Sequence, residues 1–483
     1  MTTLSKVVQE AQETKRSFAA QVAETQNCIE ASLRLLPVTI KTRKQTNLNI
    51  PNILLQNFQV YEGIISMLFV HPCYFQKLLQ SNTIDRDLLE SWVIKVYSSP
   101  VESNRITNLV LALTLMVVED EVKESDPSNK VEIHVKSFYP RLYRFLLNGQ
   151  KCNVNFFKEI AEHVMLKIMI EEYNGDPLIK EALSLSIEQL EINKPENYFN
   201  LGCCINDKNN EKKNTMQAEI MIERHIRVIK KMETYLKNIF SQPHFGGTGK
   251  ISKEISYLNK RIIEEYKYLA ENKEKIPNDE SPTQFKKRID KIVKDTELLV
   301  IELFFGQIGE FLINSEIHGI IAPEPYKQLF SKTNLESLAN TINSYFQQKK
   351  IVAKPVFDPL NTYLETHSKK PETIKSFITG LTACEDYDIT LENITLITEE
   401  TIEPISRYNA KFTIEDILKI QNSLIKFLKY PNYLPAGNND PLMVILNYLG
   451  LVEVDLSIFS EQVLQHPLNL KINSEYIFFF LLI

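Results

Sequence analysis

Apolar residues recur every three or four positions along most of this chain, with polar residues between them. This spacing places the apolar side chains on one side of a helix, so it predicts amphipathic α-helices rather than strands. The clearest series begin at Phe58, Ile106, Phe156, Leu335 and Ile417. Polar stretches predict loops at 126–129 and 193–215, and short extended pieces are expected only around 389–397. The predicted fold class is all-α.

Two longer stretches have patterns of their own. Between Met221 and Ile239 the apolar residues step by four and three positions, which forms a single apolar seam on one helix. Packing of this seam within a helical domain is the main interpretation; a short coiled coil with a partner is the alternative, although the series is shorter than about three heptads. The run from Leu298 to Leu312 is apolar on nearly all sides, so it predicts a helix buried in the core.

Local cues mark where helices start and stop in the last part of the chain. Thr413 and Asp416 have the spacing of a capping box, in which each side chain bonds the backbone N–H of the other residue. Asp440 followed by Pro441 predicts a further helix start, because Asp is a good cap and Pro fits the first helical position. Gly450 predicts the end of that helix.

The composition is that of an ordinary soluble globular protein, since 43% of the 483 residues are hydrophobic and 24% are charged. The net charge is −6, so the basic excess that usually marks a nucleic-acid-binding protein is missing. The 6 cysteines are scattered without Cys-x-x-Cys spacing, which disfavours a zinc or redox site and favours reduced thiols in the cytosol. The polar N-terminus and the short apolar run Tyr476–Ile483 lead us to expect neither a signal peptide nor a transmembrane segment.

Motifs of catalytic and cofactor sites are incomplete or missing in the sequence. Gly246–Lys250 resembles part of a phosphate-binding loop, but His244 and Ile251 stand where that loop requires Gly and Ser or Thr. A flexible loop between helices is therefore the interpretation. The 8 histidines are dispersed without a His-Glu-x-x-His pair, and no Gly-x-Ser-x-Gly elbow occurs. No metal, cofactor or hydrolase activity is expected.

Five segments carry patterns that occur together in one known family. They are Asn57–Leu79, Ile94–Val122, Leu142–Ile160, Gly309–Tyr345 and Phe412–Gly450. The most informative stretch is Gly309–Phe330, in which Ile320-Ile321-Ala322-Pro323 follows an apolar run. In order and spacing these segments resemble the Ras-GTPase-activating (RasGAP) fold, and its IQGAP branch most closely. The resemblance implies a RasGAP-type helical domain over 51–350 and a smaller, mostly helical C-terminal region over 351–456.

The same resemblance gives two asparagines a meaning. GTPase-activating proteins insert an arginine that stabilises the charge on the transferred phosphoryl group, which is worth about 10³–10⁵ in rate. Active members of the family have that arginine in a loop that corresponds to Leu146–Gln150, and Asn148 stands in its place. A second arginine, which braces the loop in active members, is replaced by Asn314 in the triplet Leu312-Ile313-Asn314.

From this resemblance we expect a regulator that binds GTP-loaded small GTPases of the Rac/Rho or Ras families, with weak or no acceleration of hydrolysis. The implied GTPase-binding residues are Leu147, Asn148, Gly149, Gln150, Lys151, Asn314, Ile320, Ile321, Pro323 and Lys332. One alternative is an active enzyme that uses Arg141 or Arg144. A second alternative is a helical scaffold that does not bind a GTPase. Lys332 can equally be a solvated surface lysine.

The IQGAP branch further implies a cytoplasmic scaffold at the actin cortex that takes part in cytokinesis. The calponin-homology domain and the IQ repeats of full-length animal members are missing here, so actin contact is expected through partners such as cortexillin-type crosslinkers. Residues 1–50 are expected to form a helical and linker segment. Residues 457–483 are expected to be a tail, and its abrupt apolar end indicates a truncated or mis-spliced gene model.

Overall fold

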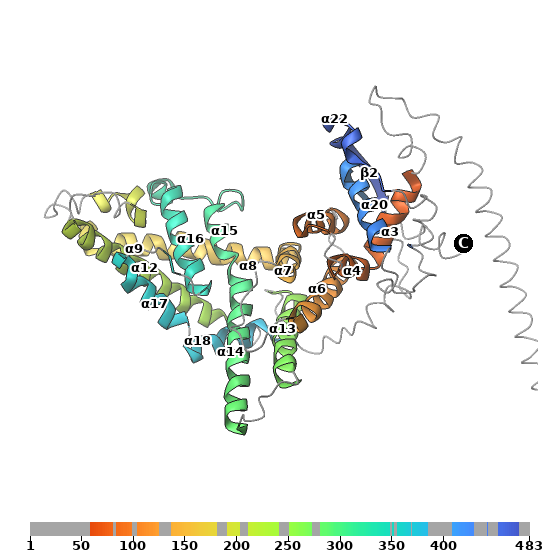
Figure 1. Cartoon of the computed structure of the whole chain (residues 1–483). Coiled ribbons are helices and arrows are strands. Elements are labelled where there is room, and N and C mark those ends of the chain that lie inside the picture. Colours follow the sequence, from red (N-terminus) through yellow and green to blue (C-terminus); the bar gives the residue numbers. More distant parts are fainter. Residues whose placement is uncertain are drawn as a thin grey trace, which may run out of the picture. The chain divides into compact units, whose positions relative to one another are not determined.

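The computed structural model describes residues 58–80, 84–98, 104–124, 137–180, 191–202, 211–240, 251–272, 281–347, 350–351, 355–368, 370–384, 408–428, 442 and 453–472. In this part of the chain almost every element is a helix, and a two-stranded sheet is the only β structure (Figure 1). The predicted all-α class is therefore confirmed. Among the same residues, no helix has the length and apolar character needed to cross a membrane.

Contacts between residues divide the chain into two compact units, one formed by 1–113 with 389–483 and the other by 114–388. The domain boundaries expected from the sequence, after residues 50, 350 and 456, stay predictions. The division falls within helix α6 (Asn104–Glu124). The first unit also contains α3 (Phe58–Val70), α4 (Cys73–Gln80), α5 (Arg86–Tyr97), β1 (Tyr408–Thr413), α20 (Ile414–Leu428), η10 (Leu456–Ile458), α22 (Glu461–Leu464) and β2 (Pro467–Ile472).

The second unit has more described residues than the first, and all of its described elements are helices. It contains α7 (Tyr139–Asn148), α8 (Lys151–Glu162), the π-helix η2 (His163–Met169), α9 (Ile170–Gly175), α10 (Pro177–Lys180), η4 (Pro195–Asn197), α12 (Glu211–Phe240), α13 (Lys253–Asn272), α14 (Pro282–Phe305), α15 (Ile308–Ile313), η6 (Glu324–Tyr326), α16 (Lys332–Gln347), η7 (Pro355–Phe357), α17 (Asp358–Ser368) and α18 (Pro371–Leu381).

The core of the first unit surrounds Tyr97 at the end of α5. Its ring packs against Phe69 and Phe75, and its hydroxyl donates to the Leu68 and Phe69 carbonyl oxygens at 3.2 and 3.1 Å. A longer-range bond joins α3 to α20, where the Tyr61 hydroxyl donates to Gln421 Oε1 at 2.6 Å. Segments from both ends of the sequence thus share one apolar interior.

The two strands were not predicted. β1 and β2 pair antiparallel, with Tyr408 opposite Ile472 and Thr413 opposite Pro467. β2 lies in the stretch that the sequence assigned to a tail, and β1 lies just before the predicted helix at 414. Each strand has six residues and its partner is more than fifty residues away, so the local pattern contains no hairpin turn that announces the pair. The predicted extended region at 389–397 lies outside the described residues.

The predicted capping box is confirmed at the start of α20. Thr413 Oγ1 accepts from the Asp416 N–H at 3.1 Å, and Asp416 Oδ2 accepts from the Thr413 N–H at 2.8 Å. Asp416 also forms an ion pair with Lys95 of α5 at 2.6 Å. Burial opposes the ionisation of Asp416, but the hydrogen bonds from Lys95 and Thr413 outweigh it and lower the pKa of this carboxyl below its usual value. The apolar stripe Ile417-Ile420-Leu424 is buried as predicted.

In the second unit, α12 is buried on more sides than a single seam. The predicted seam residues Met221, Val228 and Met232 are fully buried, and a second stripe that contains Ile229 and Leu236 is buried as well. The helix contacts α16, α17 and α18 within the unit, which agrees with packing inside a helical domain. Its first residue is Glu211, so the predicted loop over 193–215 is five residues too long at its end.

The apolar run 298–312 is two helices rather than one. α14 ends at Phe305, where the Gly306 N–H donates to the Glu302 carbonyl oxygen at 2.9 Å, and α15 begins at Ile308. The break lets α15 turn against α16, and Gly309 permits the approach because a Cβ there would lie 2.5 Å from the Asn343 side chain. The expected burial does hold for Phe304, Phe305 and Leu312.

Several sequence predictions fall outside the described residues. These are the loop at 126–129, the glycine-rich stretch 246–250 and all of the helix expected over 440–450 except residue 442.

Candidate functional site

The turn between α7 and α8 carries half of the residues expected to contact a GTPase. α7 ends at Asn148, and the Gly149 N–H caps its last turn with a hydrogen bond of 2.9 Å. Leu147 is fully buried, whereas Asn148, Gly149 and Lys151 are exposed and Gln150 is half-buried. These five residues therefore present one amide and one ammonium group to solvent.

Asn153, on the first turn of α8, fixes the base of this turn. Its buried Nδ2 donates to the Leu147 carbonyl oxygen at 3.3 Å and to Ser252 Oγ at 3.2 Å, and its Oδ1 accepts from the Ser252 N–H at 2.9 Å. The Gln150 amide nitrogen donates to Glu254 Oε2 at 3.4 Å. The bonds from Asn153 to Ser252 and from Gln150 to Glu254 both reach the start of α13. They form a polar anchor that holds the α7–α8 turn in one position. Asn153 was not predicted as an anchor, because a single asparagine inside a helix is common on surfaces.

The second candidate region is the segment after α15. The Asn314 N–H donates to the Glu310 carbonyl oxygen at 2.9 Å and closes the helix. The chain then turns back, because the Ile320 N–H donates to the Ser315 carbonyl oxygen at 2.9 Å. Gly319 has a φ of 73°, a conformation that residues with a Cβ rarely adopt, so glycine is required for this turn.

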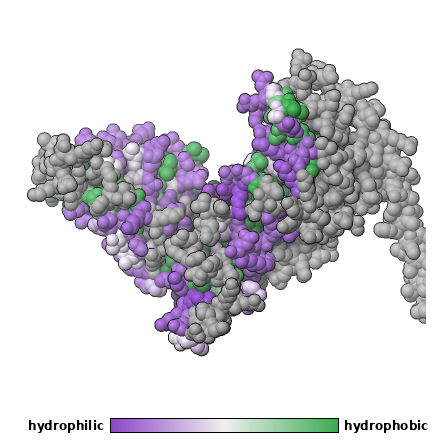
Figure 2. Space-filling model, in the orientation of Figure 1, coloured by the Kyte–Doolittle hydropathy of each residue, from purple (hydrophilic) through white to green (hydrophobic). Residues whose placement is uncertain are grey.

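Apolar side chains on this segment are divided between core and solvent. Ile320 is buried, with 2% of its surface exposed, whereas Ile317 and Ile321 are each 82% exposed. Ile313 is 36% exposed, and Pro323 is exposed. Figure 2 shows apolar colour at the tip of the loop that follows α15 in Figure 1. Ile317 and Ile321 thus expose apolar surface within five residues of each other in the sequence.

The two regions are held together by the packing of α8 on α15. The rings of Phe157 and Phe311 lie 5.6 Å apart, and Phe311 in turn stacks on His318 at 3.9 Å. Lys158 Nζ lies 3.6 Å from the position that a Cβ of Gly319 would occupy. Lys158 follows Lys151, the first residue of α8, by seven residues, so the two lie about 10 Å apart along the helix axis. The α7–α8 turn and the turn at Gly319 are therefore near the same stretch of α8.

Arg144, one of the two alternative arginines, lies on α7 near the residue that precedes α15. With the Gln307 amide oriented to suit its neighbours, its oxygen accepts from Arg144 Nε at 3.2 Å and its nitrogen donates to Glu310 Oε2 at 3.3 Å. Arg144 thereby joins α7 to the residue that precedes α15. Arg141, one turn earlier, is half-buried. Arg144 is an exposed residue, so this link between α7 and Gln307 lies at the surface.

The remaining candidate, Lys332, lies at the start of α16. It is 80% exposed and its Nζ lies 3.7 Å from Glu336 Oε1, one turn along the same helix. The chain on both sides of Lys332 is anchored by other segments. Before it, the Tyr326 hydroxyl accepts from Asn174 Nδ2 at 2.8 Å; after it, Asn334 Nδ2 donates to the Pro195 carbonyl oxygen at 2.7 Å. Lys332 thus has the solvated position of a surface lysine on a well-anchored helix start.

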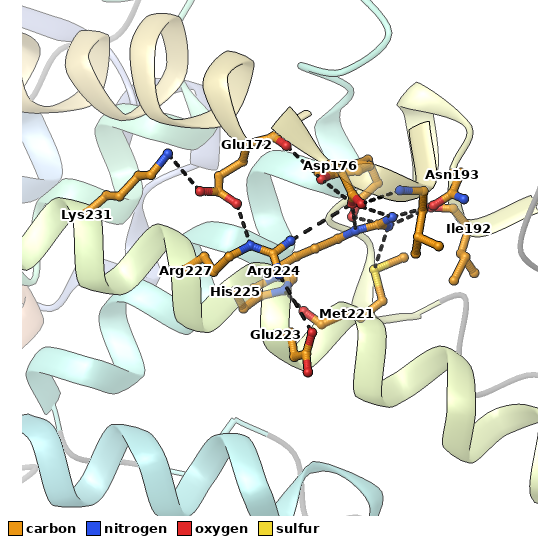
Figure 3. A network of polar contacts seen from close by, with 12 residues as sticks. Glu172, Asp176, Ile192, Asn193, Met221, Glu223, Arg224, His225, Arg227 and Lys231 are labelled. Carbon is orange, nitrogen blue, oxygen red and sulfur yellow. Dashed lines mark hydrogen bonds and ion pairs between the residues drawn. The ribbon is translucent and has the colours of Figure 1, made fainter. Parts of the chain in front are cut away.

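A buried polar cluster around α9 and α12 was not predicted from the sequence (Figure 3). Its centre is Arg224 of α12, which is fully buried and bonds Asp176, Asn193 and the Ile192 and Tyr198 carbonyl oxygens. The guanidinium also lies 3.8 Å from the centre of the Tyr198 ring. The cluster ties residues 192–198 to α9 and α12, so its evident role is to hold that loop.

Charges at the edge of this cluster are paired. Glu172 accepts from Arg227 Nε at 2.6 Å and forms an ion pair with Lys231 Nζ at 2.8 Å. Burial opposes the ionisation of Asp176, but hydrogen bonds from Tyr198, the Leu178 N–H and Arg224 outweigh it and lower the pKa of this carboxyl. Opposite charges therefore balance within the cluster, which is the usual requirement for burying them.

His225 lies beside Arg224 and is fully buried. Its Nδ1 contacts the Met221 carbonyl oxygen at 2.9 Å, and in the described part of the chain its Nε2 has no hydrogen-bond partner. Burial lowers the pKa of His225 to about 4, and the neighbouring Arg224 charge acts in the same direction. The imidazole is therefore neutral at pH 7.

Within the described residues, no group of three or more His, Cys, Asp or Glu side chains is arranged to hold a metal ion. Comparison of the sequence with protein-family models and with curated proteins gave no significant match.

Proposed function

We propose that this chain binds a small GTPase of the Rac/Rho or Ras families in its GTP-loaded form and does so without accelerating hydrolysis. The contact surface consists of the α7–α8 turn (147–151), the segment 314–323 and Lys332. One observation carries the proposal: two turns with family-like sequences lie on helices that pack against each other, and each turn exposes side chains that a partner would contact.

The apolar part of this surface supports binding of a protein rather than of a small molecule. Ile317 and Ile321 project into solvent from a turn that is fixed by its own backbone hydrogen bonds and by Gly319. Burial of an exposed isoleucine contributes about 1.5–3 kcal/mol, so two of them are sufficient to dominate a small interface. If they contact the GTP form better than the GDP form, binding prolongs the GTP state.

The chemistry at Asn148 supports the non-catalytic part of the proposal. Its amide can donate a hydrogen bond to a phosphate oxygen, but it carries no charge to oppose the charge that develops during phosphoryl transfer. The rival function is an active enzyme that uses Arg144. For that role Arg144 would have to exchange its bond to Gln307 for the nucleotide, and the link between α7 and Gln307 would be lost.

A role as a cytoplasmic scaffold at the actin cortex belongs to the same proposal. It rests on the IQGAP resemblance alone, with actin contacted through crosslinking partners of the cortexillin type.

The test is a binding assay with purified Rac, Rho and Ras proteins, each loaded with GDP or with a non-hydrolysable GTP analogue. We expect retention of at least one GTPase in the GTP-analogue form only. Equal binding of both forms, or no binding, would leave the scaffold without GTPase contact as the better function. A hydrolysis assay completes the test, because acceleration above about tenfold contradicts the non-catalytic part.

A further inference from the structure

Helix α14 carries a basic face near its N-terminal end. Five cationic residues lie within nine positions: Lys286, Lys287, Arg288, Lys291 and Lys294. All four lysines are exposed, and Arg288 is half-buried with its guanidinium 5.2 Å from the centre of the Phe285 ring. Asp290 is the single acidic residue in the same stretch. We call these five residues the basic face of α14.

The geometry of the helix turns these charges away from the core. Lys287, Lys291 and Lys294 have the spacing i, i+4, i+7, so they form one row along the helix. Ile289, Ile292 and Leu299 are buried on the opposite side, where α14 packs against its neighbours. Figure 1 shows the first turns of α14 extending past the neighbouring helices of the same unit, and Figure 2 shows mainly hydrophilic colour there.

Among the described residues, the lysines of this face lack the acidic partners that several other charged residues of the unit have. Lys237, Arg261 and Lys267 each have an acidic partner on the same helix. Within the described part of the chain, Lys286, Lys287, Lys291 and Lys294 form no ion pair; Glu297, one turn after Lys294, interacts with it only at longer range. These four lysines thus place positive charge without a described ion-pair partner on a chain whose net charge is −6.

We propose that the basic face of α14 binds the anionic surface of a lipid membrane. Its charges are mostly ammonium groups on flexible stems, which suit a diffuse negative surface better than the forked, directional pairing that arginine gives. They stand on the end of α14 that extends past its neighbours in Figure 1. Tyr268, near the C-terminal end of the contacting helix α13, is 63% exposed, and a tyrosine is well suited to the headgroup level.

The net negative charge of the chain makes this attachment directional. An anionic membrane repels most of the molecule and attracts the projecting end of α14, so the second unit would be held with that end toward the lipid. The surface involved contains none of the residues assigned to GTPase binding. The inference therefore stands independently of the proposed function.

The test is flotation of the full chain with phosphatidylcholine vesicles that contain or lack phosphatidylserine, at about 0.1 M and about 1 M salt. The full chain is expected to bind only the phosphatidylserine vesicles, and only at low salt. The variant Lys287→Gln/Lys291→Gln/Lys294→Gln is expected to bind on the order of 100-fold more weakly, because each lysine near an anionic surface contributes about fivefold. Exposed lysine-to-glutamine changes in a helix preserve folding, which circular dichroism can verify.

The matched control is Lys260→Gln/Lys327→Gln/Lys375→Gln, which removes the same charge from three other exposed positions of the unit. It is expected to bind within about threefold of the unchanged chain. Equal losses in both triple variants, or no binding of the unchanged chain, would overturn the proposal. Binding to polyglutamate that depends on the same three lysines, without binding to vesicles, would assign the face to an acidic protein instead.

Discussion

Arg224 Nη2 lies 3.0 Å from Asp176 Oδ2, and 0% and 4% of these side chains are exposed. Such a pair is tolerated in an interior because each charge neutralises the other and the remaining donors find acceptors. Arg224→Met would leave the Asp176 carboxylate buried without its nearer ion-pair partner. We expect this change to lower the free energy of unfolding by about 3–5 kcal/mol, measured by urea denaturation followed by circular dichroism.

A charge removed from the rim of the same cluster serves as the control. The Lys231 side chain is 41% exposed, so Lys231→Gln is expected to cost less than about 1 kcal/mol. The double variant Arg224→Met/Asp176→Leu is expected to recover part of the loss, since it removes both buried charges. Equal destabilisation by Arg224→Met and Lys231→Gln would show that the buried pair has no special weight.

His225 predicts how the stability of this region depends on pH. Burial holds its folded pKa at about 4, below the value near 6.5 of an exposed histidine. Between these values the unfolded chain binds a proton that the folded chain does not, so stability falls as the pH falls. The contribution of neutral His225 to the free energy of unfolding is complete above about pH 6.5 and is lost by about pH 4. The whole change is about 3 kcal/mol.

The measurement for His225 is the midpoint of urea unfolding at pH 7 and at pH 5 for the unchanged chain and for His225→Phe. The phenylalanine cannot take up a proton, so the difference between the two pH values should shrink in the variant. The lowered pKa of Asp176 does not confuse the result, because its effect begins only below its usual value of 3.8. Identical pH dependence in both proteins would contradict the assignment.

Features that depend on residues close together in the sequence were predictable, and features that depend on distant partners were not. The Thr413–Asp416 box was predictable because its two members are three residues apart and a helix start is a local event. The pairing of β1 with β2 was not, since it joins residues far apart in sequence with no turn between them. Arg224 and Asn153 were missed for a related reason: their burial is set by partners on other elements, and the residue types alone favour a surface position.

Parts of the proposed site were chosen from the sequence. The resemblance in the order of segments pointed to the α7–α8 turn and the stretch 314–323, and it assigned both Ile320 and Ile321 to contact with a GTPase, which stays a prediction. It did not predict that the first is buried and the second exposed, because that depends on the turn at Gly319. The exposure of Ile317 and the bond between Arg144 and Gln307 also required coordinates.

The exposed isoleucines provide a direct test of the proposed binding surface. Ile317→Asp/Ile321→Asp places two charges where an apolar partner surface would lie, and since both side chains are 82% exposed the fold should tolerate the change. We expect binding to the GTP-loaded GTPase to weaken at least about 100-fold. The measurement is a dissociation constant from titration calorimetry or from surface plasmon resonance.

Ile458 gives the matched control for that experiment. It is 70% exposed and belongs to the other unit, so Ile458→Asp should leave GTPase binding unchanged. If both aspartate variants weaken binding equally, the effect is one of general charge. If neither does, the segment 314–323 is not the contact surface.

Asn148 permits a test in which activity is gained rather than lost. Asn148→Arg places a guanidinium at the exposed end of α7, where a positive charge also suits the helix C-terminus, so the variant should fold normally. If the turn faces the nucleotide of a bound GTPase, the arginine supplies the missing charge stabilisation and GTP hydrolysis should accelerate about 10- to 100-fold in single-turnover assays. The full effect of about 10³–10⁵ is not expected, because Asn314 leaves the loop without the second arginine.

Lys151→Arg changes only the type of cation in the same turn and should give no gain. Asn148→Lys should give less than Asn148→Arg, because an ammonium group lacks the planar fork that fits phosphate oxygens. A folded Asn148→Arg variant that still binds the GTPase but gives no acceleration would place this turn away from the nucleotide.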